Sequence, residues 1–135
     1  MPENYKQKIE RVQTIQNYLV SIMQTITNFL SVKKTYDDLV KCMEWPSCFV
    51  LYTGGENLDV REIANSIVHY DIVIVNRLEN EMDNLSIAKL IIEKFEDYTL
   101  NKNCIGLMPG WPKNYFDTIG ETKTVQTVIT LDIEI

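Results

Sequence analysis

The sequence has few of the residues from which metal, redox and phosphate sites are usually built. It contains one histidine, three cysteines and five glycines among 135 residues. The cysteines, Cys42, Cys48 and Cys104, form no CxxC pair, so neither a zinc site nor a disulfide framework is indicated. We therefore expect reduced thiols, no bound metal and no cofactor.

Long apolar runs and an excess of basic residues are also lacking. No segment approaches the roughly 18 to 20 apolar residues that a membrane-spanning helix needs, and the N-terminus carries no apolar leader. The formal net charge of -6 disfavours a nucleic-acid-binding face, because neutralising phosphates requires clustered Lys and Arg. The sequence therefore favours a protein made in the cytosol, with neither a membrane nor a specific nucleic acid as partner.

The remaining composition is that of an ordinary globular domain, with 45% hydrophobic and 24% charged residues. A chain of this length buries about two-thirds of its unfolded surface and needs no disulfide or metal to fold. No repeat or low-complexity segment divides it. We expect a single α+β domain over residues 1–135.

A long N-terminal helix is predicted over about residues 3–30, because apolar residues recur there at spacings of three and four. The stripe consists of Tyr5, Ile9, Val12, Ile15, Leu19, Ile22, Ile26 and Phe29. The same spacing is compatible with a coiled-coil seam, but it lasts only about three and a half heptads. We expect the helix to pack on a sheet, with ends long enough to reach a neighbouring subunit.

A first strand is predicted at Cys48–Thr53, which is rich in aromatic and β-branched residues. Pro46 suits its start, and the pair Gly54–Gly55 ends it with a turn that permits positive φ. The glycine pair lacks the GxxxxGK[ST] and GxGxxG patterns, and the nearby Glu56 and Asp59 would repel a phosphate. We therefore interpret the glycines as backbone features.

Two longer segments alternate between apolar and polar residues. The more apolar face carries Val68, Tyr70, Ile72, Ile74 and Leu78 in residues 66–78, and Val125, Ile129, Leu131, Ile133 and Ile135 in residues 123–135. Strands with one apolar face are typical of an antiparallel sheet packed on a core. A short strand is expected at Cys104–Met108, and a short strand or helical turn around Tyr36–Val40.

A second helix is predicted after the polar residues 79–84. Helical spacing runs from Leu85 to Tyr98, Asn80 or Asp83 suits the N-cap, and the helix should end near Leu100. The expected order is α-β-β-α-β-β, a mostly antiparallel sheet with two helices packed on one face.

Catalysis has little support among the residue types present. His69 and Asp71 would share one face of a strand and could form a base with its orienting carboxylate, but a nucleophilic cysteine would still have to lie beside them. The simpler interpretation is a half-exposed His–Asp pair. No DxDxDG or HExxH pattern indicates a metal site. We expect no enzyme.

The segment PGWPKNYFDTIGE, residues 109–121, is predicted to be an irregular loop because it holds two prolines and two glycines. Its aromatic residues either fold back as a lid over the sheet or stay exposed as a contact for a partner. The candidate interface residues are Trp111, Tyr115 and Phe116 here, and Glu56, Asp59 and Glu62 after the glycine pair.

The order and style of these segments resemble the tail terminator and tail-completion (minor tail) proteins of long-tailed phages and prophages. The resemblance rests on the long helix, WPSCFVLYTGGE, SIVHYDIVIVNRL, NLSIAKLIIEKF and PGWPKNYFDTIGETKTVQTVITLDIEI, and it covers nearly the whole chain. It implies a non-enzymatic subunit that forms a ring, commonly a hexamer, between the tail tube and the head-side connector. An acidic ring would also let DNA pass, because negative charge repels phosphate.

The partners that the resemblance implies are further copies of this protein, the tail-tube protein and the head–tail connector proteins. It implies the host bacterial cytoplasm during assembly, and then the virion tail, as locations. Three alternatives remain open: a head-closure or other neck protein, a protein-binding adaptor that uses residues 111–116, and a small enzyme that uses His69, Asp71 and a cysteine.

Overall fold

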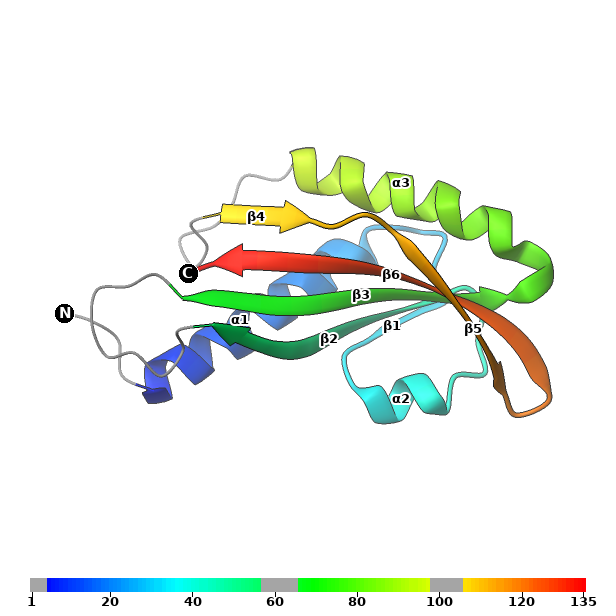
Figure 1. The fold of residues 1–135 in the computed structure, drawn as a ribbon, viewed down its shortest axis with the longest axis horizontal. Helices are drawn as coiled ribbons and strands as arrows, with labels where there is room; N and C mark the ends of the chain where they lie inside the picture. Colours follow the sequence, from blue (N-terminus) through cyan, green and yellow to red (C-terminus); the bar gives the residue numbers. More distant parts are fainter. Residues whose placement is uncertain (1–4, 57–65, 98–105) are drawn as a thin grey trace.

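The computed structural model describes residues 5–56, 66–97 and 106–135. Its centre is a six-stranded sheet in the order β1-β2-β3-β6-β4, with β5 also paired to β6 (Figure 1). The elements are α1 (Tyr5–Gln24), β1 (Ser31–Lys33), α2 (Tyr36–Val40), β2 (Ser47–Glu56), β3 (Ile67–Arg77), the 3-10 turn η1 (Leu78–Asn80), α3 (Glu81–Asp97), β4 (Gly106–Pro109), β5 (Lys113–Ile119) and β6 (Thr122–Glu134). Every described strand pair is antiparallel except β1 with β2.

The α+β class and the mostly antiparallel sheet are therefore confirmed. Of the short strand or helical turn expected around Tyr36–Val40, the structure has the helix, α2, and the long alternating strands are β3 and β6. The predicted order is incomplete, because it lacks β1, α2 and β5. β1 has three residues, too few for any periodic pattern to be visible.

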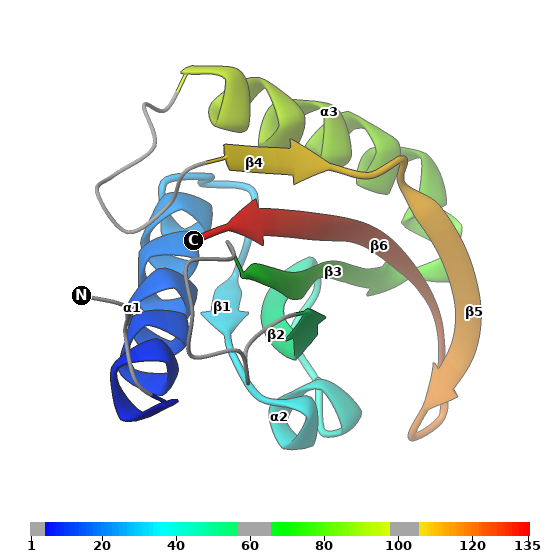
Figure 2. The same ribbon diagram turned by 60° about the vertical axis from the view of Figure 1, so that its left-hand side comes forward.

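Both long helices pack on one face of the sheet, as predicted, and enclose the main core (Figure 2). Alternation in β3 and β6 turns their apolar side chains toward these helices. The core joins Val12, Ile15, Leu19, Ile22 and Met23 of α1, Val68, Tyr70, Ile72 and Ile74 of β3, Ile129, Leu131 and Ile133 of β6, and Ile87, Ala88, Ile91 and Phe95 of α3.

The first helix differs from its prediction at its C-terminal end and in which residues face the core near its start, while the predicted start near residue 3 lies outside the described residues. It ends at Gln24 rather than near residue 30, because the Thr25 amide bonds to Ile22 O at 3.1 Å and the Thr25 hydroxyl also donates to Ile22 O. Ile9 is 57% exposed, since Lys8 takes the inward position and donates to Ser66 Oγ at 3.1 Å. Among the side chains that the structure describes, the buried stripe thus begins at Lys8 and Val12.

A second, smaller core lies on the opposite face of the sheet. There Leu39 and Cys42, from α2 and the turn after it, pack on the sheet. The other buried members are Phe49, Val73, Val75 and Ile119. The strands are therefore covered on both faces at this end, and the β5–β6 hairpin bends round the side that carries α2 (Figure 2).

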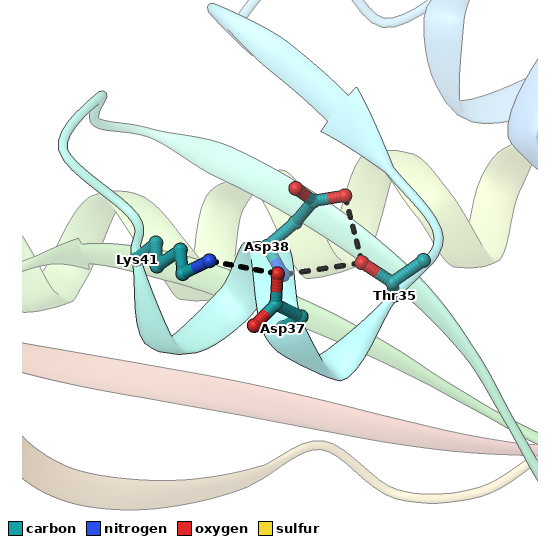
Figure 3. A network of polar contacts seen from close by, with 4 residues as sticks. All are labelled: Thr35, Asp37, Asp38 and Lys41. Atoms are coloured by element: carbon teal, nitrogen blue, oxygen red, sulfur yellow. Dashed lines mark hydrogen bonds and ion pairs between the residues drawn. The ribbon is translucent and has the colours of Figure 1, made fainter.

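The short helix α2 is held by its own polar contacts (Figure 3). The Thr35 side chain accepts a hydrogen bond from the Asp38 amide at 3.1 Å, and its hydroxyl donates to Asp38 Oδ2 at 2.7 Å. Lys41 pairs with Asp37 one turn earlier at 3.0 Å. These contacts satisfy a free amide at the helix start and keep Leu39 directed at the second core.

The second long helix begins at Glu81, immediately after Asn80, so Asp83 lies inside it and is not its cap. Leu85 is 46% exposed and Ile87 is buried in its place, because the apolar stripe of α3 is rotated from the predicted one. Leu78 leaves β3 in the 3-10 turn and is partly exposed. The predicted helix end at Leu100 and strand start at Cys104 lie outside the described residues.

Candidate functional site: the open edges of the sheet

The exposed aromatic residues gather on β5 and the segment before it. Trp111 is 86% exposed, Tyr115 54% and Phe116 62%, so they do not form a lid over the sheet. The prediction of an irregular loop is wrong as well. Lys113–Ile119 pairs along its length with β6, and Gly120, with φ of 62°, begins the two-residue loop of the hairpin.

The β4–β5 side forms one open edge of the sheet. β4 pairs with the last part of β6 and β5 with its first part, on the side of β6 that β3 does not use. No strand among the described residues pairs with the outer side of β5. All of its side chains are exposed except Ile119. A seven-residue strand with aromatic side chains and a bare backbone edge is a ready template for another strand.

The second open edge belongs to β2, at the other side of the sheet. β1 pairs only with Ser47–Phe49, and a Gln16 side-chain amide donates to Val50 O at 2.9 Å. From Leu51 to Glu56 no strand in the described ranges pairs with this side of β2. The sheet therefore offers one unpaired edge in each direction.

The glycine pair lies within β2 rather than ending it. The register with β3 shifts between Tyr52 and Gly54. Gly54 has φ of 130°, a backbone conformation that residues other than glycine rarely adopt. A bulge of this kind adds one residue to the strand and increases its local twist. The predicted positive φ is present at Gly54, but it belongs to a bulge in an edge strand and not to a turn.

The acidic residues of the predicted interface are only partly described. Glu56 is the last residue of β2 and is exposed, with its carboxylate 3.8 Å from His69 Nε2. Asp59 and Glu62 lie outside the described residues. The structure therefore tests the placement of Glu56 alone, and it puts this carboxylate at the end of the open β2 edge.

His69 pairs with a carboxylate that the sequence pattern does not indicate. Its Nδ1 lies 2.5 Å from Asp132 Oδ1, across the β3–β6 pairing. Asp71 lies on the same face of β3, and burial raises the pKa of its carboxyl above the usual value, while a hydrogen bond with Thr130 and the nearby His69 act in the opposite direction. A pocket of about 280 Å³ borders Glu56, His69 and Asp132.

The cysteines of the described chain lie apart from this histidine. Cys48 pairs with Ile74, five residues along β3 from His69, which is about 17 Å at the usual strand rise. Its side chain belongs to the main core on the helix face, and burial raises the pKa of its thiol far above the usual range. Cys42 is buried, and its thiol donates to Glu44 O. Cys104 lies outside the described residues.

A larger pocket of about 620 Å³ lies between α3 and the start of β2. Arg77 stacks on the Trp45 ring beside it, with Cζ 5.1 Å from the ring centroid. The pocket is also lined by Pro46, Asn76 and Asp83. This mixed lining gives no set of convergent catalytic groups.

The described residues show neither a metal cluster nor a membrane-spanning helix. Within the described ranges, no three His, Cys, Asp or Glu side chains are arranged to hold a metal ion. None of the described helices is long and apolar enough to cross a membrane. No family model matches the sequence, and a comparison with curated proteins finds no significant match. The open edges are the features that best distinguish this surface.

Proposed function

We propose that this protein is a non-enzymatic structural subunit of a phage or prophage particle, which forms an oligomeric ring and completes the tail at the head–tail junction. The observation that carries the proposal is the open edge at each side of the sheet, one of them lined by exposed aromatic side chains. A subunit with two different unpaired sheet edges can bind its neighbours head to tail. Such contacts close into a ring when the rotation between neighbouring subunits permits. The sequence resemblance supplies the tail context.

The partners in this proposal are further copies of the chain, the tail-tube protein and the connector proteins. The ring assembles in the host bacterial cytoplasm and then remains in the virion tail. DNA passes through it without specific binding, which is consistent with the net charge of -6. A head-closure or other neck position would use the same ring architecture.

Light scattering and electron microscopy of the purified protein, alone and with tail tubes from the same particle, test this proposal. Closed rings, or a single disc on the tube end, support a tail-completing role. A protein that stays monomeric at high concentration and leaves tube ends bare contradicts it. Rings that bind portal-side proteins but no tube favour the head-closure position.

A protein-binding adaptor is the second candidate, because Trp111, Tyr115 and Phe116 are all strongly exposed. Aromatic residues with this exposure are typical anchors of protein interfaces. The adaptor would be a monomer that binds a different protein through residues 111–116. The oligomeric state in the experiment above separates it from a ring subunit.

A further inference from the structure

The two open edges match in length. β5 has seven residues, and the part of β2 beyond β1 runs from Val50 to Glu56. The carbonyl of Val50 already accepts a hydrogen bond from Gln16, so within the described part of the chain Leu51–Glu56 is the stretch left without a strand on this side. Each edge is therefore long enough to hold most of the other.

The strand directions also match. β2 is antiparallel to β3, β3 to β6, and β6 to β5, so β5 runs antiparallel to β2. In a ring, all copies have the same orientation about the axis, so β5 of one copy meets β2 of the next in an antiparallel pair. Antiparallel pairing is the slightly more stable kind.

We propose that β5 of one copy adds to β2 of the next copy, with Lys113 opposite Glu56, and that this contact builds the ring. The inference rests on the proposed ring-forming function and names the surfaces that assemble. It uses the described edges only, and the partner is a second copy of this chain.

The faces of the sheet restrict the register, since residues opposite each other in paired strands lie on the same face. Lys113 pairs with Val128, which packs on the second core, and Glu56 lies on that same face beside His69. The ammonium group of one copy thus meets the carboxylate of the next.

Two further positions agree with this register. Tyr115 falls opposite Gly54, which has no side chain, so the aromatic ring can cover the exposed backbone of the bulge. Beyond the bulge at Thr53, Phe116 falls opposite Tyr52 on the helix face, where Tyr52 already contacts the Tyr70 ring. Aromatic cross-strand pairs are among the stabilising ones. Charge, glycine and aromatic positions therefore select one alignment.

A cysteine pair at these positions tests the contact. Hydrogen-bonded and non-hydrogen-bonded pairs alternate along the hairpin from its two-residue loop, and this alternation makes Lys113–Val128 a hydrogen-bonded pair. The backbone groups of Lys113 therefore point toward β6, so Lys113 takes a non-hydrogen-bonded position in a pair with a neighbouring copy. There the two Cα atoms lie about 4.5 Å apart, which permits a disulfide. The experiment oxidises Lys113→Cys/Glu56→Cys protein under mild conditions and separates the products on a non-reducing gel. Cys104→Ser is included in every variant to remove a competing thiol.

The expected result is a ladder of covalent oligomers up to the ring number, present with the double variant and absent with either single variant. A mixture of the two single variants should give dimers only, because each copy then carries one of the two cysteines and can be bonded to a neighbour on one side only. A double variant with Lys123→Cys in place of Lys113→Cys is the matched control, since Lys123 is exposed on the same hairpin but faces away from the proposed edge contact. Circular dichroism confirms that these surface variants are folded.

The outcomes separate this inference from the proposed function. Rings that form while the double variant gives no ladder overturn the edge pairing and leave the ring function intact. Dimers from a single variant alone also overturn it, because they indicate a two-fold contact. A ladder from protein that never binds a tail tube supports the edge pairing and overturns the tail role. If neither oligomers nor a ladder forms, with or without tail tubes, the edge pairing and the proposed ring function are both overturned.

Discussion

Replacing Asn84 by aspartate should strongly destabilise the fold. Asn84 is completely buried on α3, and its amide nitrogen lies 3.1 Å from Thr127 Oγ1, 3.3 Å from Ile74 O and 3.5 Å from Val125 O. All three neighbours are oxygen atoms that accept from this amide. The residue therefore links α3 to β3 and β6 through its two N–H groups.

The magnitude follows from these contacts. Only the Thr127 contact is within the ordinary hydrogen-bond range, so the direct loss is about 1 kcal/mol for that bond and less for the other two. The aspartate variant also places a carboxylate against these three oxygen atoms, and an uncompensated buried charge costs about 3 to 5 kcal/mol. Because whole domains have a stability of about 5 to 15 kcal/mol, this variant should be close to unfolding at pH 7.

Urea unfolding followed by circular dichroism measures the effect. Asn84→Leu removes the amide without adding charge and should lose about 1 to 3 kcal/mol, less than Asn84→Asp. Asn17→Asp is the matched control: Asn17 is exposed, and its side-chain oxygen already accepts from Lys34 Nζ at 2.9 Å. An Asn84→Asp variant that unfolds at the same urea concentration as Asn17→Asp would refute the argument. Lowering the pH toward 4 should narrow the difference, because a protonated carboxyl carries no buried charge.

Three further changes test the fold. Tyr70→Phe removes a buried hydroxyl that donates to Val12 O at 2.6 Å and should lose about 1 to 2 kcal/mol, whereas Tyr52→Phe, on a partly exposed ring, should change the urea midpoint little. Thr35→Ala removes the cap of α2 and should cost about 1 kcal/mol, and Thr35→Ser should retain most of it; equal midpoints for the two would contradict the capping role. Burial raises the pKa of Asp71 in the folded state, so the folded state binds this proton more tightly than the unfolded state does. The free energy of unfolding should therefore decline as the pH rises from about 4, the usual pKa of an aspartate in the unfolded chain. Asp71→Asn should therefore gain stability relative to the unchanged protein between pH 3.5 and 7, and a constant difference across that range would contradict it.

The parts of the fold that sequence patterns predict are those with one buried face. β3 and β6 alternate, and the alternating residues Val68, Tyr70, Leu131 and Ile133 are fully buried. The stripe of α1 is similarly readable, although Ile9 and Lys8 exchange roles at its start. Burial on one side imposes a period on the sequence, and the period can be recognised without knowledge of the fold.

Contacts between distant strands are not readable in this way. His69 and Asp132 are 63 positions apart, and their meeting depends on the register between β3 and β6. A shift of one residue would turn one of the two side chains to the other face. The sequence therefore suggests Asp71, the carboxylate nearest along the chain, while the structure places Asp132 in direct contact with the ring.

The strand β5 escapes sequence-based prediction for a reason that bears on function. Six of its seven side chains are exposed, so neither face imposes alternation on Lys113–Ile119. A strand exposed on both faces and along one edge gains its missing burial only when another strand pairs with it. If β2 of a neighbouring copy takes that place, Tyr115 and Phe116 acquire partners that one chain cannot supply. The absence of a pattern in this segment is then expected of an interface whose second half belongs to another copy.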